Sequence, residues 1–377
     1  MKILTVLENN SWITHHISGS LCDMGHEVWQ FNYGDAVGEF YGRNRRQDRN
    51  RKNQDLLKVA GDLVRDKGLD LIFCYVYDDF LQEDTAAKLR QLNIPMLNYN
   101  VDMVNQWYRQ IRTAKYFTYM LCAQKINMEN MASYGGNVLY FPMAGRISDR
   151  SDSTNSFIPE QPVTFMGTPM PYRNHVLKKL IDKDVPLAIY GKFWNENKVA
   201  TADRSVEKTV SDICHYGLAR YKSEGAAGLL TPLTNRLFKQ SFPSSAEIPK
   251  KVLCGFLDQS DIENLFKYSK INLGFSRMMG DDPDKPGVNQ VKLRDFEVPL
   301  SGGFYLAEKA PDYDELFEIG SEVETWSTHD ELLEKINYYL DHEEERKKVA
   351  KAGHERAIKY HTWEVRFKAL FDKLKIA

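Results

Sequence analysis

The order of apolar and amphipathic segments limits what this chain can fold into more strongly than any single motif. Short apolar runs of strand length alternate with longer segments in which apolar residues recur at helical spacing. In Asp55–Lys67, for example, an apolar stripe runs from Leu56 to Val64, and Gly68 follows as the expected helix end. Strands that are joined by helical crossovers form parallel, doubly wound sheets. The pattern therefore predicts an α/β protein.

This alternation occurs twice, on either side of a polar stretch without periodicity. The first set of expected strands is Lys2–Leu7, His26–Phe31, Leu71–Tyr77, Pro95–Val101, Phe117–Ala123 and Val138–Phe141. The second set is Val163–Met166, Leu187–Tyr190, Val252–Phe256, Ile271–Phe275 and Gly303–Ala307. A chain of 377 residues is also longer than one hydrophobic core usually supports. We therefore predict an N-terminal Rossmann-like domain over 1–150, a linker over 151–162, a C-terminal Rossmann-like domain over 163–360 and a terminal helix over 361–377.

Two polar segments fit neither set. Residues 195–250 contain many polar, glycine and proline residues, so we expect an insertion with short helices. It could be a flap, a dimer contact or an acceptor platform, or a surface elaboration without a role in chemistry. The run Gly42–Lys52 carries six basic residues and one acidic residue. It could meet an anionic acceptor or a membrane surface, and the ordinary interpretation is a solvated, mobile loop.

Composition and charge exclude several classes of protein. The formal net charge is −2 at pH 7, so the chain as a whole is not a nucleic-acid binder. No run approaches the roughly 18 apolar residues of a membrane span, and the N-terminal apolar stretch is too short for a signal peptide. The five cysteines are odd in number and far apart in the sequence, which argues against a disulfide framework. We expect a cytoplasmic protein with at most a peripheral membrane contact.

Common cofactor and metal motifs are missing from the sequence. The loop after Lys2–Leu7 has no glycine-rich dinucleotide fingerprint, and no phosphate-binding loop of the NTPase type occurs. An HExxH motif is also missing, and so is an Asp-x-Asp motif near a strand end. The acidic run Asp281–Asp284 lies in a Gly- and Pro-rich loop and is best interpreted as a solvated turn. We therefore expect no cofactor and no essential metal.

Candidate functional residues in the N-terminal domain follow its strands, because ligands of open α/β sheets bind beyond the carboxyl ends of the strands. The loop after Lys2–Leu7 leads into a helix that carries His15, a candidate catalytic residue for which a structural role is at least as well supported. Asp102 follows Pro95–Val101 and could act as a general base. It could equally be the N-cap of a helix over Met103–Ile111.

The C-terminal domain shows a glycine followed by a cation after each of its first two strands. Gly167 follows Val163–Met166, and Arg173 lies near the start of the next helix. Gly191 and Lys192 follow the second strand in the same way. A glycine lets the backbone approach a ligand closely, and a cation can bind phosphate oxygens. Each pair alone is a weak signal.

The segment Val291–Glu308 is the richest in candidate binding residues. Lys292, Arg294 and Glu297 precede a Gly-Gly turn and a strand. The two cations could hold a diphosphate, and the carboxylate could accept both hydroxyls of a ribose. The alternative is an exposed charged helix in which Arg294 and Glu297 form an ordinary i,i+3 ion pair.

These residues also carry a resemblance to a known family. The segment from about residue 250 to 371 resembles the CgeB-like (spore maturation protein) group of glycosyltransferases. The matching positions are Arg294, Phe296, Glu297, Gly302 and Gly303, then Leu316, Phe317, Gly320 and Glu322, and finally His361, Thr362 and Arg366. The N-terminal domain matches this group only in its layout.

The resemblance implies an α/β protein of the GT-B fold, with two Rossmann-like domains that face each other across a deep cleft. It implies that the last helix crosses back to the N-terminal domain, and that the C-terminal domain holds a nucleotide-sugar donor, with a UDP-sugar as the default expectation. In similar proteins a Glu-x7-Glu element contacts the sugar and the ribose. Glu297 fits its second position, whereas Asn289 stands at the first.

The resemblance further implies that a sugar is transferred to an acceptor, whose identity the sequence leaves open: a protein, a glycan or a small molecule. Lys192, Lys292, Arg294 and Arg173 are the candidates for stabilising the leaving diphosphate without a metal. Asp102 or His15 would deprotonate the acceptor of an inverting enzyme. A nucleotide-sugar epimerase and a non-catalytic binding or scaffold protein are the alternatives, and a homodimer stays open.

Overall fold

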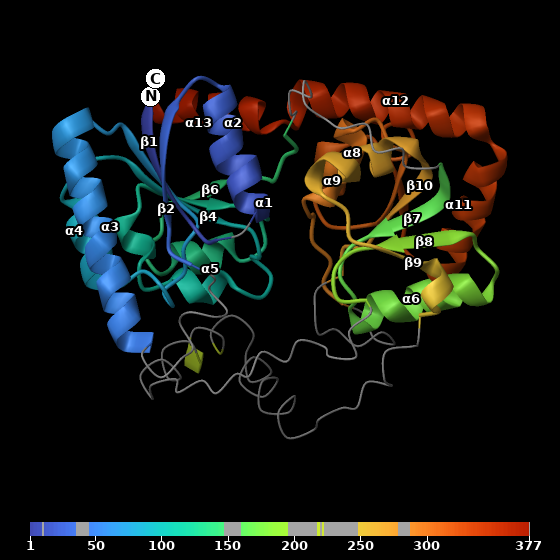
Figure 1. The fold of residues 1–377 in the computed structure, drawn as a ribbon, viewed down its shortest axis with the longest axis horizontal. Helices are drawn as coiled ribbons and strands as arrows, with labels where there is room; N and C mark the ends of the chain where they lie inside the picture. Colours follow the sequence, from blue (N-terminus) through green and yellow to red (C-terminus); the bar gives the residue numbers. More distant parts are fainter. Residues whose placement is uncertain are drawn as a thin grey trace. The chain divides into compact units, whose positions relative to one another are not determined.

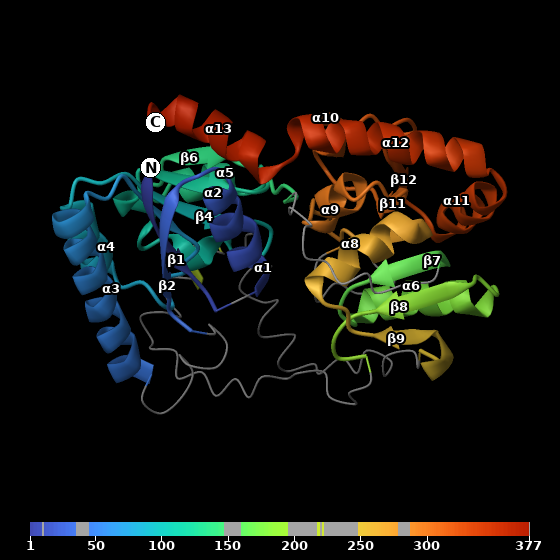
Figure 2. The ribbon, with the colours of Figure 1, turned by 45° about the horizontal axis from the view of Figure 1, so that its top comes forward.

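The computed structural model describes residues 1–9, 11–34, 45–146, 160–194, 217–218, 221, 248–277 and 287–376. The chain divides into two compact units (Figures 1 and 2). The first comprises Met1–Pro142 together with the end of the chain from Phe367 onward, and the second comprises most of the described residues from Met143 to Arg366. Each unit contains a six-stranded sheet. The predicted α/β class with two doubly wound units is therefore confirmed.

The sheet of the first unit is parallel and has the strand order β2-β1-β3-β4-β5-β6. Its strands are β1 (Lys2–Leu7), β2 (Glu27–Asn32), β3 (Leu71–Cys74), β4 (Met96–Asn100), β5 (Tyr119–Cys122) and β6 (Val138–Tyr140). Ile3 of β1 lies between Val28 on one side and Leu71 on the other. The strand order therefore reverses between β1 and β3, which is the switch point of this sheet.

The helices of the first unit include α1 (Ser11–Ile13), a π-helical segment over Thr14–Ser18, α2 (Gly19–Asp23), α3 (Arg45–Lys67), α4 (Glu83–Arg90) and α5 (Met128–Ala132). Gly25 and Gly68 have φ angles of +80° and +74°, so both end their helices as the sequence predicts. The helix predicted over Met103–Ile111 is wrong. That segment forms turns and a short 3₁₀ helix over Trp107–Gln110.

The basic run is not a loop throughout, because α3 already begins at Arg45. Arg49 donates hydrogen bonds to the carbonyl oxygens of Asp78, Phe80 and Leu81. This side chain therefore anchors the segment after β3 to α3. The prediction of a solvated loop is wrong for residues 45–52, and 42–44 lie outside the described residues.

The second sheet is also parallel, with the strand order β12-β11-β10-β7-β8-β9. Its strands are β7 (Gln161–Met166), β8 (Leu187–Tyr190), β9 (Leu253–Gly255), β10 (Ser269–Gly274), β11 (Tyr305–Glu308) and β12 (Glu324–Trp326). Three strands extend to one side of the switch point between β7 and β10, and three to the other, as in a Rossmann sheet.

The helices of the second unit include α6 (Pro171–Asp182), α8 (Gln259–Tyr268), α9 (Arg294–Leu300), α10 (Tyr313–Leu316), α11 (His329–Asp341) and α12 (Glu343–Tyr360). The helix α12 lies along α9 in both ribbon views (Figures 1 and 2). Residues Asp295–Pro299 of α9 are buried. The alternative interpretation of this segment as an exposed charged helix is therefore wrong, although its Arg294–Glu297 pair is present.

The end of the chain packs on the first sheet. In α13 (Trp363–Leu374), the ring of Phe367 lies 5.7 Å from that of Phe73 and 5.9 Å from that of Phe141. The last helix therefore crosses back to the first unit, as the resemblance implies.

The division between the units differs from the predicted boundaries. Met143–Arg146 belong to the second unit, because Gly145 pairs with the segment at Thr362. Residues Gln161 and Pro162, which were predicted as linker, begin β7. Most of the predicted insertion over 195–250 lies outside the described residues.

Candidate functional site

The carboxyl ends of β7 and β10 form the switch point of the second sheet, where ligands of open α/β sheets bind. The backbone is crowded there. The N–H of Gly167 donates to the carbonyl of Tyr190 at 2.9 Å, and a Cβ atom on Gly191 would lie 2.0 Å from the carbonyl oxygen of Gly167. The indole N–H of Trp194 donates to that same oxygen at 2.8 Å. The predicted glycines therefore come together, and Gly191 is needed for this close approach.

Arg173 is the cation that this crowded loop holds. Its Nη1 donates to the carbonyl of Thr168 at 3.0 Å, and its guanidinium lies 5.6 Å from the centre of the Phe165 ring. The buried Nε atom has no hydrogen-bond partner among the described residues. Burial, and then the positive charge of Arg294, lower the pKa of Arg173 to about 10. An anion would relieve both effects.

Arg294 and Glu297 lie on the buried helix α9 and pair with each other. The Nη1 atom of Arg294 donates to Glu297 Oε2, and the guanidinium lies 5.2 Å from the centre of the Phe266 ring. Arg294 is 33% exposed and Glu297 only 8%. A carboxylate in this position is held in a fixed orientation, and the guanidinium keeps an exposed part.

The two predicted lysines have other surroundings. Lys292 donates from Nζ to the carbonyl oxygens of Phe275 and Arg277, at 3.0 and 2.8 Å, and so braces the segment after β10. Its backbone N–H donates to the buried carboxylate of Asp295. The Nζ of Lys192 lies 4.4 Å from the centre of the Phe256 ring, on an exposed part of the unit. Binding of phosphate by either lysine stays a prediction.

Glu308 was not among the predicted residues, although it organises the same end of the sheet. It lies at the end of β11 and is 3% exposed. Its Oε1 accepts from the Tyr172 hydroxyl at 2.7 Å, and its Oε2 accepts from the backbone N–H groups of Ser276 and Arg277 at 2.9 and 3.0 Å. The guanidinium of Arg277 lies 3.7 Å from the centre of the Tyr172 ring. The sequence offered one signal for Glu308, because this carboxylate directly follows the apolar run YLA.

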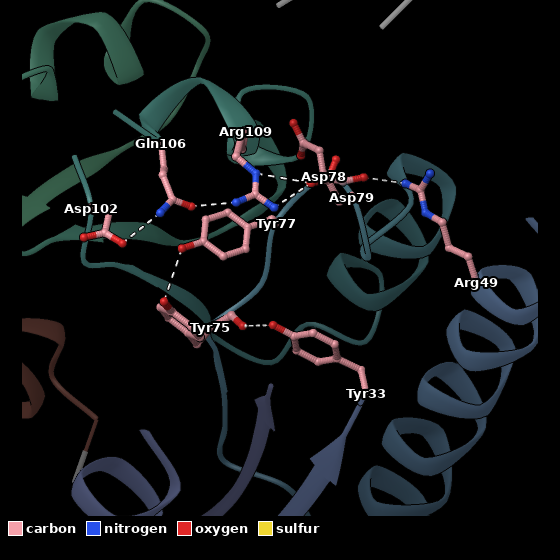
Figure 3. Close-up of polar contacts among 9 residues, drawn as sticks. All are labelled: Tyr33, Arg49, Tyr75, Tyr77, Asp78, Asp79, Asp102, Gln106 and Arg109. Carbon is pink, nitrogen blue, oxygen red and sulfur yellow. Dashed lines mark hydrogen bonds and ion pairs between the residues drawn. The ribbon is translucent and has the colours of Figure 1, made fainter. Parts of the chain in front are cut away.

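The first unit gathers tyrosines at the switch point of its own sheet (Figure 3). Tyr75 and Tyr77 follow β3, and their hydroxyl oxygens are 3.2 Å apart. The hydroxyl of Tyr33 donates to the carbonyl of Tyr75 at 2.7 Å. The pKa values of all three are raised, first by burial and then in part by the negative charge of Glu8. These phenols therefore stay protonated and can serve as hydrogen-bond donors.

Asp102 lies beside these tyrosines at the end of β4. Its carboxylate accepts a hydrogen bond from the amide of Gln106 at 2.8 Å, and its charge helps to raise the pKa values of Tyr75 and Tyr77. Gln106 in turn accepts from Arg109 at 2.6 Å. The alternative role of Asp102 as the cap of an α-helix is wrong, because no α-helix follows it.

Asp78 fixes the segment that carries Arg109. Its carboxylate accepts from the backbone N–H groups of Arg112 and Thr113, at 3.0 and 3.2 Å, and from the Thr113 hydroxyl at 2.7 Å. The backbone N–H of Asp78 donates to the carbonyl of Arg109 at 2.7 Å. Burial raises the pKa of Asp78 to about 7. This residue is therefore a structural anchor for the polar site.

His15 lies on the π-helical segment after β1. Its ring meets that of His16 edge-on at 5.0 Å. Nearby, the ring of Trp12 lies 6.0 Å from that of Tyr75 in an edge-to-face arrangement. A π-helical turn is often found at functional positions. A catalytic role for His15 stays a prediction.

Several of the residues that carry the family resemblance after β11 brace one another within the second unit. The carbonyl oxygen of Leu316 lies 2.7 Å from Nε2 of His361 and accepts from Nε of Arg356 at 3.0 Å. Arg356 also lies 3.6 Å from the carboxylate of Glu322. The backbone N–H of Gly145 donates to the carbonyl of His361. These contacts hold helices and loops of the second unit together.

Among the described residues, no group of three or more histidine, cysteine, aspartate or glutamate side chains is arranged to hold a metal ion. No helix in the described ranges is long and apolar enough to cross a membrane.

Residues 226–372 match a family model described as "Glycosyl transferase-like". No curated protein matches the chain. Among solved structures, the Anabaena protein HepE in complex with UDP and glucose is 13% identical, with 100% of this chain and 99% of that chain covered and a TM-score of 0.58.

Two further structures have the same architecture. Sucrose-phosphate synthase from Thermosynechococcus elongatus is 10% identical, with 99% of each chain covered and a TM-score of 0.58. A glycosyltransferase from Rickettsia africae is 10% identical, with 99% of this chain and 97% of that chain covered and a TM-score of 0.54. The chain therefore has the two-unit GT-B fold, and its C-terminal part matches a glycosyltransferase-like family model.

Proposed function

We propose that this protein is a glycosyltransferase, which moves a sugar from a nucleoside diphosphate sugar to a hydroxyl group of an acceptor. The observation that carries the proposal is the guanidinium of Arg173, whose buried Nε has no partner among the described residues. It lies at the switch point of the second sheet, where a ligand is expected. A diphosphate has the charge and the acceptor oxygens that such a group requires.

The donor would bind through residues of the second unit. The positive charge of Arg294 disfavours the charged form of Arg173, so a diphosphate that meets both cations would stabilise each of them. In the reaction the bond between the sugar C1 and the phosphate oxygen breaks, and negative charge develops on the leaving diphosphate. Fixed cations can stabilise that charge without a metal. Glu297, oriented by Arg294, is the candidate for the ribose hydroxyls.

The acceptor would bind on the first unit, beside the tyrosines after β3. In an inverting reaction the acceptor oxygen attacks C1, and its proton passes to a base. Asp102 is our candidate for that base, because it lies at the end of β4 and its carboxylate is oriented by Gln106. The buried hydroxyls of Tyr75 and Tyr77 are protonated donors that could orient an acceptor oxygen.

Two observations support this reading without identifying the substrates. The C-terminal part of the chain matches the glycosyltransferase-like family model. HepE, which has the same fold, was crystallised with UDP and glucose. A UDP-sugar is therefore the first donor to test. We further propose that the enzyme needs no metal, lies in the cytoplasm and forms a homodimer.

Thermal denaturation with a panel of nucleotides tests the proposal. A ligand that binds only the folded protein raises the melting temperature as its occupancy grows. At a ligand concentration of about 100 times Kd, the free energy of unfolding rises by about 2.7 kcal/mol. We expect a shift with UDP or a UDP-sugar, with EDTA present throughout. We then expect release of UDP from that UDP-sugar. A folded protein that responds to no nucleotide would overturn the proposal.

A further inference from the structure

We propose that Gln106 is a positioning residue for the carboxylate of Asp102, and that Arg109 fixes the orientation of the Gln106 amide. The inference rests on the proposed function, in which Asp102 receives the proton of the acceptor. It concerns a relay of four side chains, Asp102, Gln106, Arg109 and Asp79, which Figure 3 shows in a continuous row.

The chemistry of Arg109 decides which way the amide of Gln106 points. A guanidinium has only donor atoms, so the atom that faces it must be the amide oxygen. The Nη1 atom of Arg109 lies 2.6 Å from Oε1 of Gln106. The amide nitrogen is then directed to the other side, where it donates to Oδ2 of Asp102 at 2.8 Å. Turning the amide over would place donors together at one end and acceptors together at the other.

Arg109 is itself held in place on two sides. Its Nη2 and Nε atoms lie 2.6 and 3.2 Å from Oδ2 of Asp79, and both side chains of this pair are 24% exposed. The guanidinium lies 4.2 Å from the centre of the Tyr77 ring. The Tyr77 ring and the Asp79 carboxylate together fix the plane of the guanidinium. The guanidinium then orients the amide of Gln106, and this amide orients the carboxylate of Asp102.

The backbone supports the same geometry. The N–H of Gln106 donates to the carbonyl of Asp102 at 2.9 Å, and the N–H of Arg109 donates to the carbonyl of Gln106 at 2.9 Å. The three residues therefore belong to one sequence of turns.

Several charged or titratable groups surround the carboxylate of Asp102. Tyr75 and Tyr77 interact with its charge, and Glu8 interacts with both tyrosines. Arg109 lies beyond Gln106, with its charge balanced by Asp79. The group placed between the cation and Asp102 is a neutral amide. It orients the carboxylate through a hydrogen bond and does not itself change the net charge.

Replacing Gln106 by Glu tests this arrangement with little change in shape. The new carboxylate would keep Arg109 as a partner, but Asp102 would lose the hydrogen bond from Gln106 and gain a like charge, which raises its pKa. The variant Gln106→Met removes the donor without adding charge. The matched control is Gln91→Glu, a charge change at an exposed glutamine of the same unit.

The first measurement is the release of UDP from UDP-glucose, with water as the acceptor, as a function of pH. We expect kcat to fall at least about tenfold in Gln106→Met, because a positioned base contributes much more than this factor. In Gln106→Glu the acid limb of the pH profile should move to higher pH. The KM for UDP-glucose should stay unchanged in both, and Gln91→Glu should behave as wild type. Rates and profiles like those of wild type in both Gln106 variants would overturn the proposal.

The second measurement does not depend on activity. In protein labelled with ¹³C at the aspartate carboxyl carbons, the Asp102 signal is identified by its loss in Asp102→Asn. Its titration should move to higher pH in Gln106→Glu and stay in place in Gln91→Glu. An unchanged titration would show that Gln106 does not act on Asp102. If wild type turns over no nucleotide sugar, the proposed function fails, and this titration alone decides whether the relay orients Asp102.

Discussion

Arg366 donates a hydrogen bond from Nη2 to Nδ1 of His361, at 2.8 Å. Since a guanidinium cannot accept, Nδ1 must carry a lone pair, and the proton of the neutral ring lies on Nε2. That nitrogen is 2.7 Å from the carbonyl oxygen of Leu316, which can only accept. The two contacts therefore select one tautomer of the neutral imidazole and exclude the imidazolium, whose second N–H would face Arg366.

This relationship predicts that stability falls in mild acid. Burial, and then the charge of Arg366, lower the pKa of His361 from 6.5 to about 4. The unfolded chain then binds the proton more readily than the folded chain. The contribution of neutral His361 to the free energy of unfolding is therefore complete above pH 6.5 and is lost as the pH falls toward 4. A pKa shift of one unit corresponds to about 1.4 kcal/mol, so the free energy of unfolding can fall by about 3 kcal/mol.

Urea denaturation at a series of pH values between 7.5 and 4 checks this prediction. The variant His361→Gln should be less stable than wild type at pH 7.5, because the ring and its packing on Phe317 are lost. Its stability should vary less than that of wild type between pH 6.5 and 4. If wild type and His361→Gln lose the same stability over that interval, His361 is not the responsible group.

The basic run at the start of α3 offers a second prediction, because its arginines have different surroundings. Arg49→Met should lower the free energy of unfolding by about 2–3 kcal/mol, since the carbonyl oxygens of Asp78 and Leu81 would lose the hydrogen bonds that they accept from this cation. Arg51→Met should change it by less than about 0.5 kcal/mol, because Arg51 is 68% exposed and, among the described residues, forms a surface ion pair with Asp48 on its own helix. Chemical denaturation measures the free energy of unfolding of both variants. Equal decreases in the two variants would contradict the role of Arg49 as an anchor of the segment after β3.

Two helical glycines should respond to alanine in opposite directions. A Cβ atom on Gly353 of α12 would lie 2.1 Å from the carbonyl oxygen of Glu322, so Gly353→Ala should destabilise the protein by about 1–3 kcal/mol. A Cβ atom on Gly61 of α3 would meet nothing within 4 Å. Gly61→Ala should stabilise by about 0.5–1 kcal/mol, because alanine restricts the unfolded chain. Differential scanning calorimetry measures both, and a stable Gly353→Ala protein would show that α12 can move away from Glu322.

Much of the fold could be predicted from the sequence, because buried parallel strands are apolar along their whole length. Lys2–Leu7 and Leu187–Tyr190 have the predicted bounds, and most other expected strands differ at their ends by a few residues. The strand β12 (Glu324–Trp326) was missed because two of its three residues, Glu324 and Thr325, are polar, so no apolar run marks it. The helix over Met103–Ile111 was wrong because backbone groups of that segment bind distant residues. Gln124 accepts from the N–H of Met103, Asn127 donates to its carbonyl, and the N–H of Asp78 donates to the carbonyl of Arg109.

The candidate site could be predicted only in part. Sequence position placed Arg173 and Gly167 correctly after β7, since the switch point follows from the strand order. It did not show that Lys292 braces carbonyl oxygens or that Glu308 accepts from two backbone N–H groups. Such contacts join residues far apart in the chain. Tyr75 and Tyr77 left a signal that was overlooked, two phenols directly after a buried strand.

Calorimetric titration with UDP tests most directly the central claim that the second unit holds a nucleoside diphosphate at Arg173. Arg173→Met should bind UDP about 10- to 100-fold more weakly than wild type, because a charge-assisted contact with phosphate is lost. Arg65→Met, a change at an exposed arginine of α3, should bind UDP as wild type does. Equal affinity of Arg173→Met and wild type, or no binding by a folded wild type, would contradict the claim.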